Sequence, residues 1–214
     1  MPAPEDATHH GVAPGVATLI APLGQKRARI YFMYRKEDGV RELSGDRRVS
    51  DFLGYRRSTG APAEWYDKAR AAGPLAEFNG ADHWVDKPAR EGVVLIGDAA
   101  AATDPDWGTG LSLTLLDVLH LRDSLCSASD WDAAIQQYSL EHDRYYGALH
   151  TVTRWYADLL WSTGQEAEER RKRVLPRLLT DPRGIPDLIG LGPESPIDDR
   201  ARRLFFGGKE LVKA

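Results

Sequence analysis

The segment 93–112 holds the residues of this chain whose types and spacing best suit ligand binding. Its first four residues, VVLI, are apolar without alternation, which is typical of a strand covered on both faces in an α/β layer. Such strands bind ligands at their carboxyl ends, and this end carries Gly97 and Asp98. Gly97 permits a close approach of backbone or ligand, and the Asp98 carboxylate can accept hydrogen bonds from a sugar or polyol hydroxyl. We therefore expect Asp98 to contact a ligand.

A turn and a helix follow this strand. Residues 104–110, DPDWGTG, predict a turn, and apolar residues at 111, 115, 118, 119 and 125 predict a helix over 111–125. The free N–H groups and positive dipole end of such a helix stabilise nearby negative charge by about 0.3–1 kcal/mol at exposed sites. The glycines allow a flat ring to lie against the backbone. Taken alone, the GTG segment is more typical of a plain loop before a core helix.

The order of these parts favours a ligand site over a plain loop. This order resembles the second flavin-binding motif of the FAD-dependent aromatic hydroxylases, the relatives of para-hydroxybenzoate hydroxylase. It consists of GDAA, then DP, then GxGLSLTLLD and a leucine-rich helix. The resemblance implies that Asp98 binds ribityl and pyrophosphate-side hydroxyls of FAD and that Pro105 lies beside the isoalloxazine. It also implies that the Gly110 and Leu111 amides bind the flavin C2 carbonyl, where a reduced flavin carries negative charge. The predicted cofactor contacts are Gly97, Asp98, Pro105, Gly108, Thr109, Gly110 and Leu111.

Some side chains depart from the family's pattern. Ala101 stands where a histidine often follows GDAA, and Thr109 and Ser112 replace the usual glutamine and asparagine. Asp117, in contrast, matches an acidic position within the family's helix. Since the departures affect side chains more than backbone contacts, the prediction of a flavin site stands.

The first half of the family's pattern is missing. The 214 residues contain no GxGxxG, the turn with which the family holds the FAD pyrophosphate. The pair Asp38-Gly39 lies in a polar stretch between strand-like segments, where a hairpin turn is its expected role. We therefore expect the carboxyl half of such an enzyme, with an α+β or α/β structure that includes a partial FAD/NAD(P)-binding fold.

Three regions follow along the chain. Residues 1–89 are predicted to be a β-rich part of a substrate-binding domain, 90–127 the carboxyl-terminal part of the FAD-binding domain, and 128–214 a helical region with a tail. Strands are predicted at 16–21 and 27–35, joined by a turn over 23–26. Arg29 and Tyr31 share one face of the second strand and are candidate substrate contacts, although a solvated sheet face is at least as typical of this pattern.

Helices are predicted elsewhere from periodicity and capping residues. Residues 62–72 predict a short helix, and a capping-box-like start at 129–132 begins a second. One face of that second helix should hold Trp131, Ile135, Tyr138, His142 and Tyr145, with His142 a packed residue. Cys126 is expected to be a buried structural thiol. The basic cluster 170–173, flanked by glutamates, predicts a solvated helix face.

Composition excludes several classes of function. The net charge of −4 argues against a nucleic-acid surface, and no apolar run approaches the ~18–20 residues of a membrane span. The first thirty residues lack a signal pattern, so a cytoplasmic location is expected. The six histidines are scattered without metal-ligand spacing, and no metal site is predicted.

The family chemistry would be a monooxygenation. NADH or NADPH would reduce the flavin, and oxygen activated there would be transferred to a small organic substrate, an aromatic one by the resemblance. No acid or base in this sequence is singled out as catalytic. Such a component would need an amino-terminal half, from another chain or a longer gene product. The alternatives are a non-catalytic remnant or interaction module and, less well supported, a flavin-dependent halogenase or reductase. Without the amino-terminal strand, the sheet holding 93–96 should have an open edge or face that invites a partner chain or self-association.

Overall fold

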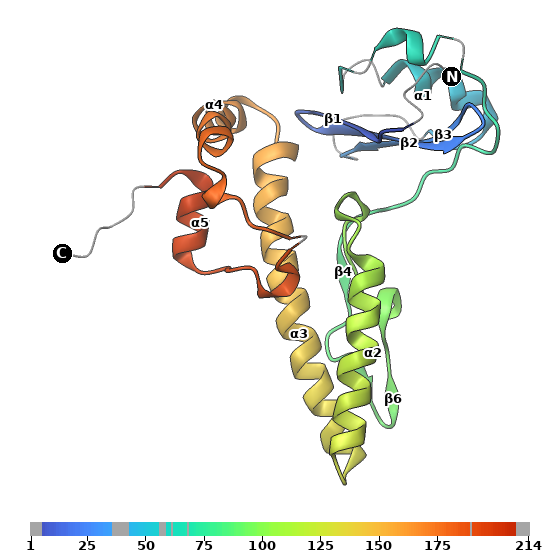
Figure 1. Cartoon of the computed structure of the whole chain (residues 1–214). Helices are drawn as coiled ribbons and strands as arrows, with labels where there is room; N and C mark the ends of the chain where they lie inside the picture. The colour runs from blue at the N-terminus through green and yellow to red at the C-terminus, as the bar shows by residue number, and fades with distance from the viewer. Residues whose placement is uncertain are drawn as a thin grey trace. The chain divides into compact units, whose positions relative to one another are not determined.

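A mixed α+β structure is formed by the part of the chain that the computed structural model describes, residues 6–35, 43–55, 59–60, 62–67, 69–188 and 190–208 (Figure 1). Small antiparallel sheets and five α-helices make up these ranges, which confirms the predicted α+β class. The chain divides into two compact units, residues 1–78 with 157–169 and residues 79–156 with 170–214. Within the described ranges, no helix has the length and apolar character needed to cross a membrane.

The first unit is built on a three-stranded antiparallel sheet in the order β1-β2-β3. Its strands are β1 (His9–Ala13), β2 (Val16–Gly24) and β3 (Arg27–Tyr34). Gln25 and Lys26 form the two-residue turn between β2 and β3, with φ angles of 53° and 58°, as a type I′ hairpin turn requires. The two predicted strands and the turn between them are confirmed, because alternation and turn chemistry are local signals. Ile20 packs with Ile30 and Tyr66 in the core of this unit.

The predicted helix over 62–72 is wrong. The described part of this segment holds one short 3₁₀ turn, Ala63–Trp65, and the α-helix of this region, α1 (Val49–Tyr55), lies earlier. Trp65 packs edge-on against His9 at 5.1 Å between ring centroids, and Tyr66 is buried against the sheet. Tertiary packing of these rings therefore overrides the weak helix propensity. The pair Asp38-Gly39 lies outside the described residues.

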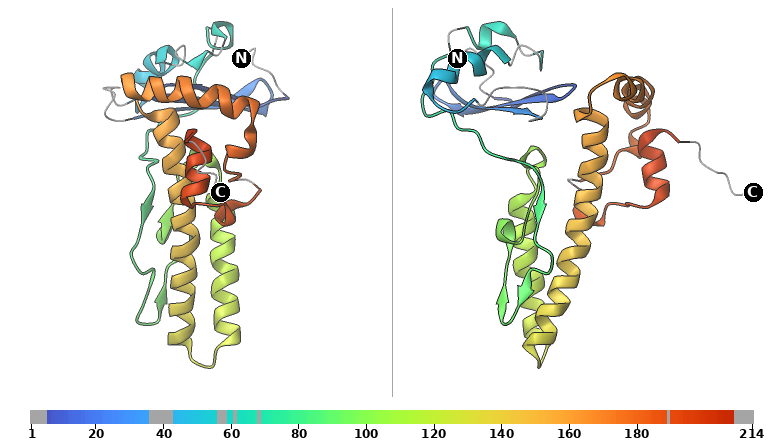
Figure 2. Two further views of the ribbon diagram at one scale, coloured as in Figure 1. Left: turned by 90° about the vertical axis from the view of Figure 1, so that its left-hand side faces the viewer. Right: turned by 180° about the vertical axis from the view of Figure 1, so that it is seen from behind.

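Two long helices form the frame of the second unit. They are α2 (Gly110–Ser127) and α3 (Trp131–Tyr156), which lie side by side and antiparallel (Figures 1 and 2). The predicted helix over 111–125 is confirmed. The predicted start of the second helix is also confirmed, because the Asp130 carboxylate accepts the Asp132 N–H at 2.9 Å. Two short antiparallel ladders complete the frame. They pair β4 (His83–Trp84) with β7 (Ala101–Ala102) and β5 (Ala89–Arg90) with β6 (Val93–Val94).

The segment 93–96 is not the covered parallel strand that its composition predicts. β6 has two residues and forms an antiparallel hairpin with β5, and Val93 is 62% exposed. Glu91 and Gly92, both with positive φ, turn the chain back on itself, so the neighbour of β6 is the preceding strand. Val94, Leu95 and Ile96 are half-buried, so Val93 is the exposed residue of this segment, and the predicted open face for a partner stays a prediction.

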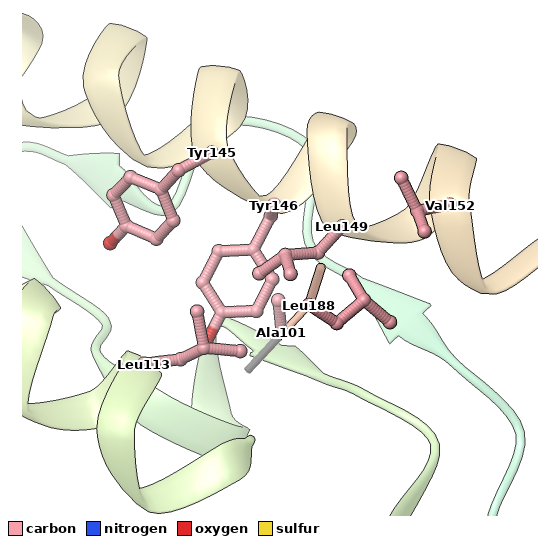
Figure 3. Packing of buried hydrophobic residues seen from close by; sticks show 7 residues of the cluster. All are labelled: Ala101, Leu113, Tyr145, Tyr146, Leu149, Val152 and Leu188. Carbon is pink, nitrogen blue, oxygen red and sulfur yellow. The ribbon is translucent and has the colours of Figure 1, made fainter. Parts of the chain in front are cut away.

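The core of the second unit lies between α2, α3 and β7. Figure 3 shows Tyr145, Tyr146, Leu149 and Val152 along α3, with the Tyr146 ring pointing toward Leu113 of α2. The cluster consists of Ala101, Leu113, Tyr145, Tyr146, Leu149, Val152 and Leu188. α4 (Gln165–Thr180) and α5 (Asp199–Phe206) complete the helical region. Buried Phe205 of α5 stacks against Trp155 of α3.

Several side chains differ from their predicted burial. His142 is buried among aromatic rings, as predicted, but Trp131 is 71% exposed because it begins α3 beyond the packed turns. Cys126 is exposed, so the predicted buried thiol is wrong. Its position follows the helical stripe of Leu111, Leu115 and Val118, which faces away from α3. In the basic cluster 170–173, Lys172 and Arg173 are exposed but Arg171 is buried.

Candidate functional site

The structure places all seven predicted cofactor contacts in the second unit, on consecutive elements of the chain. Gly97 and Asp98 lie in a 3₁₀ turn, Gly97–Ala99, and Pro105 opens another, Pro105–Trp107. Gly108 and Thr109 lead into α2, whose first residues are Gly110 and Leu111. A Cβ placed on Gly110 would lie 4.0 Å from Oδ1 of Asp98. The Asp98 carboxylate and the amino end of α2 are therefore neighbours.

Gly97 is held by α2 itself. Its N–H donates to Oδ2 of buried Asp117 at 2.7 Å. Its φ is +57°, and a Cβ there would lie 2.8 Å from Oγ1 of Thr114. Only glycine adopts this backbone at this distance from α2 without strain. The close approach predicted for Gly97 is thus an approach to a helix, and it sets the position of the neighbouring Asp98.

Burial determines the electrostatics of Asp117. Desolvation raises the pKa of this carboxyl above its ordinary value, while the hydrogen bond from the Gly97 N–H works in the opposite direction. Nearby, the Tyr138 hydroxyl donates to the Leu95 carbonyl at 2.9 Å, and burial raises the pKa of that phenol. α2 and α3 thus each hold one end of the segment 95–97 through a buried polar side chain.

The amino end of α2 presents backbone N–H groups without a side-chain cap. Thr109 stands at the N-cap position but makes no capping bond, and its hydroxyl lies 3.1 Å from that of Thr103 instead. The ladder of the helix begins with the Leu113 N–H, which donates to the Thr109 carbonyl. The amides of Gly110, Leu111 and Ser112 precede that bond and have no acceptor within the helix. This end of α2 therefore suits an anionic or carbonyl oxygen.

The predicted contacts are also accessible. Asp98, Pro105 and Gly108 are exposed, and Leu111 is 75% exposed. A Cβ on Gly108 would meet no atom within 4 Å, which leaves room for a flat group over the turn. This surface therefore combines the Asp98 carboxylate as a hydrogen-bond acceptor, the backbone N–H groups at the start of α2, and space for a flat ring over the turn.

The candidate substrate residues Arg29 and Tyr31 belong to the first unit. They lie on β3 opposite Ala21 and Leu19 of β2, and both side chains are exposed. Alternate residues Ala28 and Ile30 pack toward the core of that unit. The exposed face is compatible with a substrate wall and with a solvated sheet, so the role of Arg29 and Tyr31 stays a prediction.

Sequence reasoning missed a second group of polar residues in the second unit. Oδ2 of Asp82 lies 2.8 Å from Nδ1 of His150 and 3.1 Å from the Thr153 hydroxyl, and Oδ1 accepts the Asp104 N–H at 2.6 Å. Asp82 and His150 border a cavity of about 180 Å³. Its lining residues are Asp82, His83, Trp84, Ala102, Thr103, Tyr146 and His150. Asp82 and His150 stand 68 positions apart, and no local pattern links them.

Two other kinds of site are less developed. Among the residues that the structure describes, a hollow of about 750 Å³ in the first unit is lined by the five consecutive residues Ser44–Arg48. Within the described ranges, histidine, cysteine and acidic side chains form no group of three or more that could hold a metal ion.

Compared with models of protein families and with curated proteins, the chain matches none.

Proposed function

We propose that the second unit binds the isoalloxazine and ribityl part of FAD, and that the chain acts as the carboxyl half of a flavin-dependent monooxygenase that hydroxylates small organic molecules. The observation that carries this proposal is the exposed Asp98 carboxylate beside the uncapped amino end of α2. The motif order GDAA, DP and GxG supports it, because these segments hold the predicted contacts in the order that the flavin motif has.

The residues at this end of α2 fit the group chemically. Asp98 would accept hydrogen bonds from ribityl hydroxyls, while the Gly110 and Leu111 amides would donate to the flavin C2 carbonyl. The positive end of the helix would stabilise the negative charge of the reduced ring. When bound, FAD would take electrons from NADH or NADPH and activate oxygen for transfer to the substrate. A flavin-dependent halogenase or reductase would use the same contacts.

The exposed apolar surface of α2 supports the proposal that an amino-terminal half completes the flavin site. Leu111, Leu115, Val118 and Leu119 are 75%, 57%, 45% and 46% exposed and follow one side of the helix. This stripe begins at the same amino end where the flavin would bind. We propose that a segment carrying the GxGxxG turn covers the stripe and completes the FAD site, whether it is another chain or part of a longer product. The same stripe also favours the alternative, an interaction module without catalysis.

The test is a titration of the purified chain with FAD and with riboflavin, followed by flavin fluorescence. Similar affinities for the two are expected, because the proposed contacts reach the ring and ribityl parts that both share. Asp98→Ala should weaken binding at least about tenfold, since a hydrogen bond to a charged acceptor contributes about 1.5–3 kcal/mol. Asp123→Ala, which removes an exposed carboxylate of α2 near its carboxyl end, serves as the control and should bind as the wild type does.

The titration is repeated with a separately expressed fragment that carries a strand, a GxGxxG turn and a helix. Binding that requires this fragment supports a split monooxygenase. Unchanged binding by Asp98→Ala contradicts the assignment of that residue. The absence of binding under both conditions contradicts the flavin proposal and favours the interaction module.

A further inference from the structure

The cavity at Asp82 and His150 is lined by side chains from separate elements of the second unit. His83 and Trp84 come from β4, Ala102 from β7, and Tyr146 and His150 from successive turns of α3. The pairing of β4 with β7 and the packing of α3 therefore create it. At about 180 Å³ it has the volume of roughly six liquid waters, which suits one small ring.

Hydrogen bonds fix the chemical character of His150. Asp82 accepts the Asp104 N–H and lies within hydrogen-bond distance of Thr153, so its carboxylate is held in place and is only 18% exposed. A carboxylate has no proton to give, so Nδ1 of His150 donates to it at 2.8 Å. In the neutral ring, this leaves Nε2 as a hydrogen-bond acceptor.

Trp84 and Tyr146, two aromatic residues of the lining, are held by their own contacts. The Trp84 indole meets the His150 ring edge-on, at 5.9 Å and 84°, and its N–H donates to Asp143 at 3.3 Å. Tyr146 is 4% exposed and packs in the core cluster. The cavity thus combines flat aromatic walls with the oriented His150 acceptor and the polar side chains of Asp82, His83 and Thr103, and small-molecule sites likewise pair apolar walls with a few placed polar groups.

We propose that this cavity is a binding site for a small aromatic molecule that carries one hydrogen-bond donor. The ring packs against Trp84 and Tyr146, and the donor binds Nε2 of His150. Asp82 is a positioning residue that acts through His150 by selecting its tautomer. The proposal does not require bound flavin, because none of the predicted cofactor contacts lines the cavity, although the cavity adjoins them through the 3.1 Å contact between the Thr103 and Thr109 hydroxyls. A failure of FAD binding would therefore leave this proposal intact.

Phenol and its methyl ether, anisole, are the probes, because they share the ring and differ in the donor. Binding is followed in ¹H–¹⁵N spectra through the indole N–H signal of Trp84, assigned with Trp84→Phe. Phenol should shift that signal saturably and bind about fivefold more tightly than anisole, the effect of one neutral hydrogen bond. His150→Phe keeps a ring beside Trp84 but removes the acceptor, so phenol and anisole should then bind equally.

A matched control and a direct reading of the tautomer complete the test. His120→Phe changes another histidine of this unit, one that stacks on Tyr145, and should preserve the fivefold preference. Long-range ¹H–¹⁵N spectra of the wild type should show the proton of His150 on Nδ1. Each of four results would overturn the proposal. In the wild type these are equal binding of phenol and anisole, a His150 proton on Nε2, or no shift of the Trp84 signal up to the solubility of phenol. In His150→Phe it is a retained preference for phenol.

Discussion

The buried bond between Asp117 and Gly97 allows a quantitative test of how α2 holds the proposed site. Asp117 is fully buried, and its Oδ2 accepts the Gly97 N–H at 2.7 Å. Asp117→Ala leaves that buried N–H without an acceptor, which costs about 1–3 kcal/mol of unfolding free energy. Asp117→Asn has nearly the same shape and retains a carbonyl acceptor. We therefore expect Asp117→Asn to be more stable than Asp117→Ala by about 1–3 kcal/mol near pH 7.

The raised pKa of Asp117 adds a dependence on pH with a defined sign. The ionised carboxylate is disfavoured by burial, so the folded chain binds its proton more tightly than the unfolded chain does. The stability that this proton contributes is complete below 3.8, the ordinary pKa of the carboxyl. It is lost as pH rises through the higher pKa that Asp117 has in the folded chain. Asp117→Asn has no such ionisation. Relative to that variant, the wild type should lose stability as pH rises.

Urea denaturation of the wild type and both variants, followed by far-ultraviolet circular dichroism from pH 4 to pH 8, measures these differences. The relevant transition is that of the second unit, which contains α2 and α3. Equal losses of unfolding free energy in Asp117→Ala and Asp117→Asn would refute the role of the hydrogen bond. A wild type that gains stability over Asp117→Asn as pH rises would refute the stated effect of burial.

Two further substitutions test local geometry. Gly97→Ala should destabilise the second unit by about 1–2 kcal/mol for its left-handed backbone, and by more for the contact with Thr114. In a Thr114→Ala background, the part of the lost unfolding free energy that comes from this contact should disappear. If urea denaturation gives the same loss for Gly97→Ala in both backgrounds, the clash is contradicted. Asp198→Ala should cost about 1 kcal/mol, because the Asp198 side chain accepts the Ala201 N–H at the start of α5. Faster hydrogen exchange in the first turn of α5 is the expected sign of that loss, and exchange equal to the wild type would show that the cap contributes little.

Local patterns in the sequence were sufficient for several elements. Alternation and a two-residue turn predict β2 and β3, since register and turn type depend on neighbouring residues alone. The apolar spacing predicts α2, and the capping residue Asp130 predicts the start of α3, for the same reason. The order of the GDAA, DP and GxG segments likewise led to the candidate contacts from Gly97 to Leu111, whose cofactor role stays a prediction.

Tertiary structure decided what depends on distant partners. The composition of 93–96 is compatible with a covered parallel strand, but the neighbour of β6 is β5, and Val93 is exposed. The exposure of Cys126 follows from which side of α2 packs on α3. The pairing of Asp82 with His150 requires the segment before β4 to meet α3 at a residue 68 positions later in the chain. Amino-acid sequence alone sets local backbone preference, whereas burial and polar pairing depend on contacts that form only when separate elements pack together.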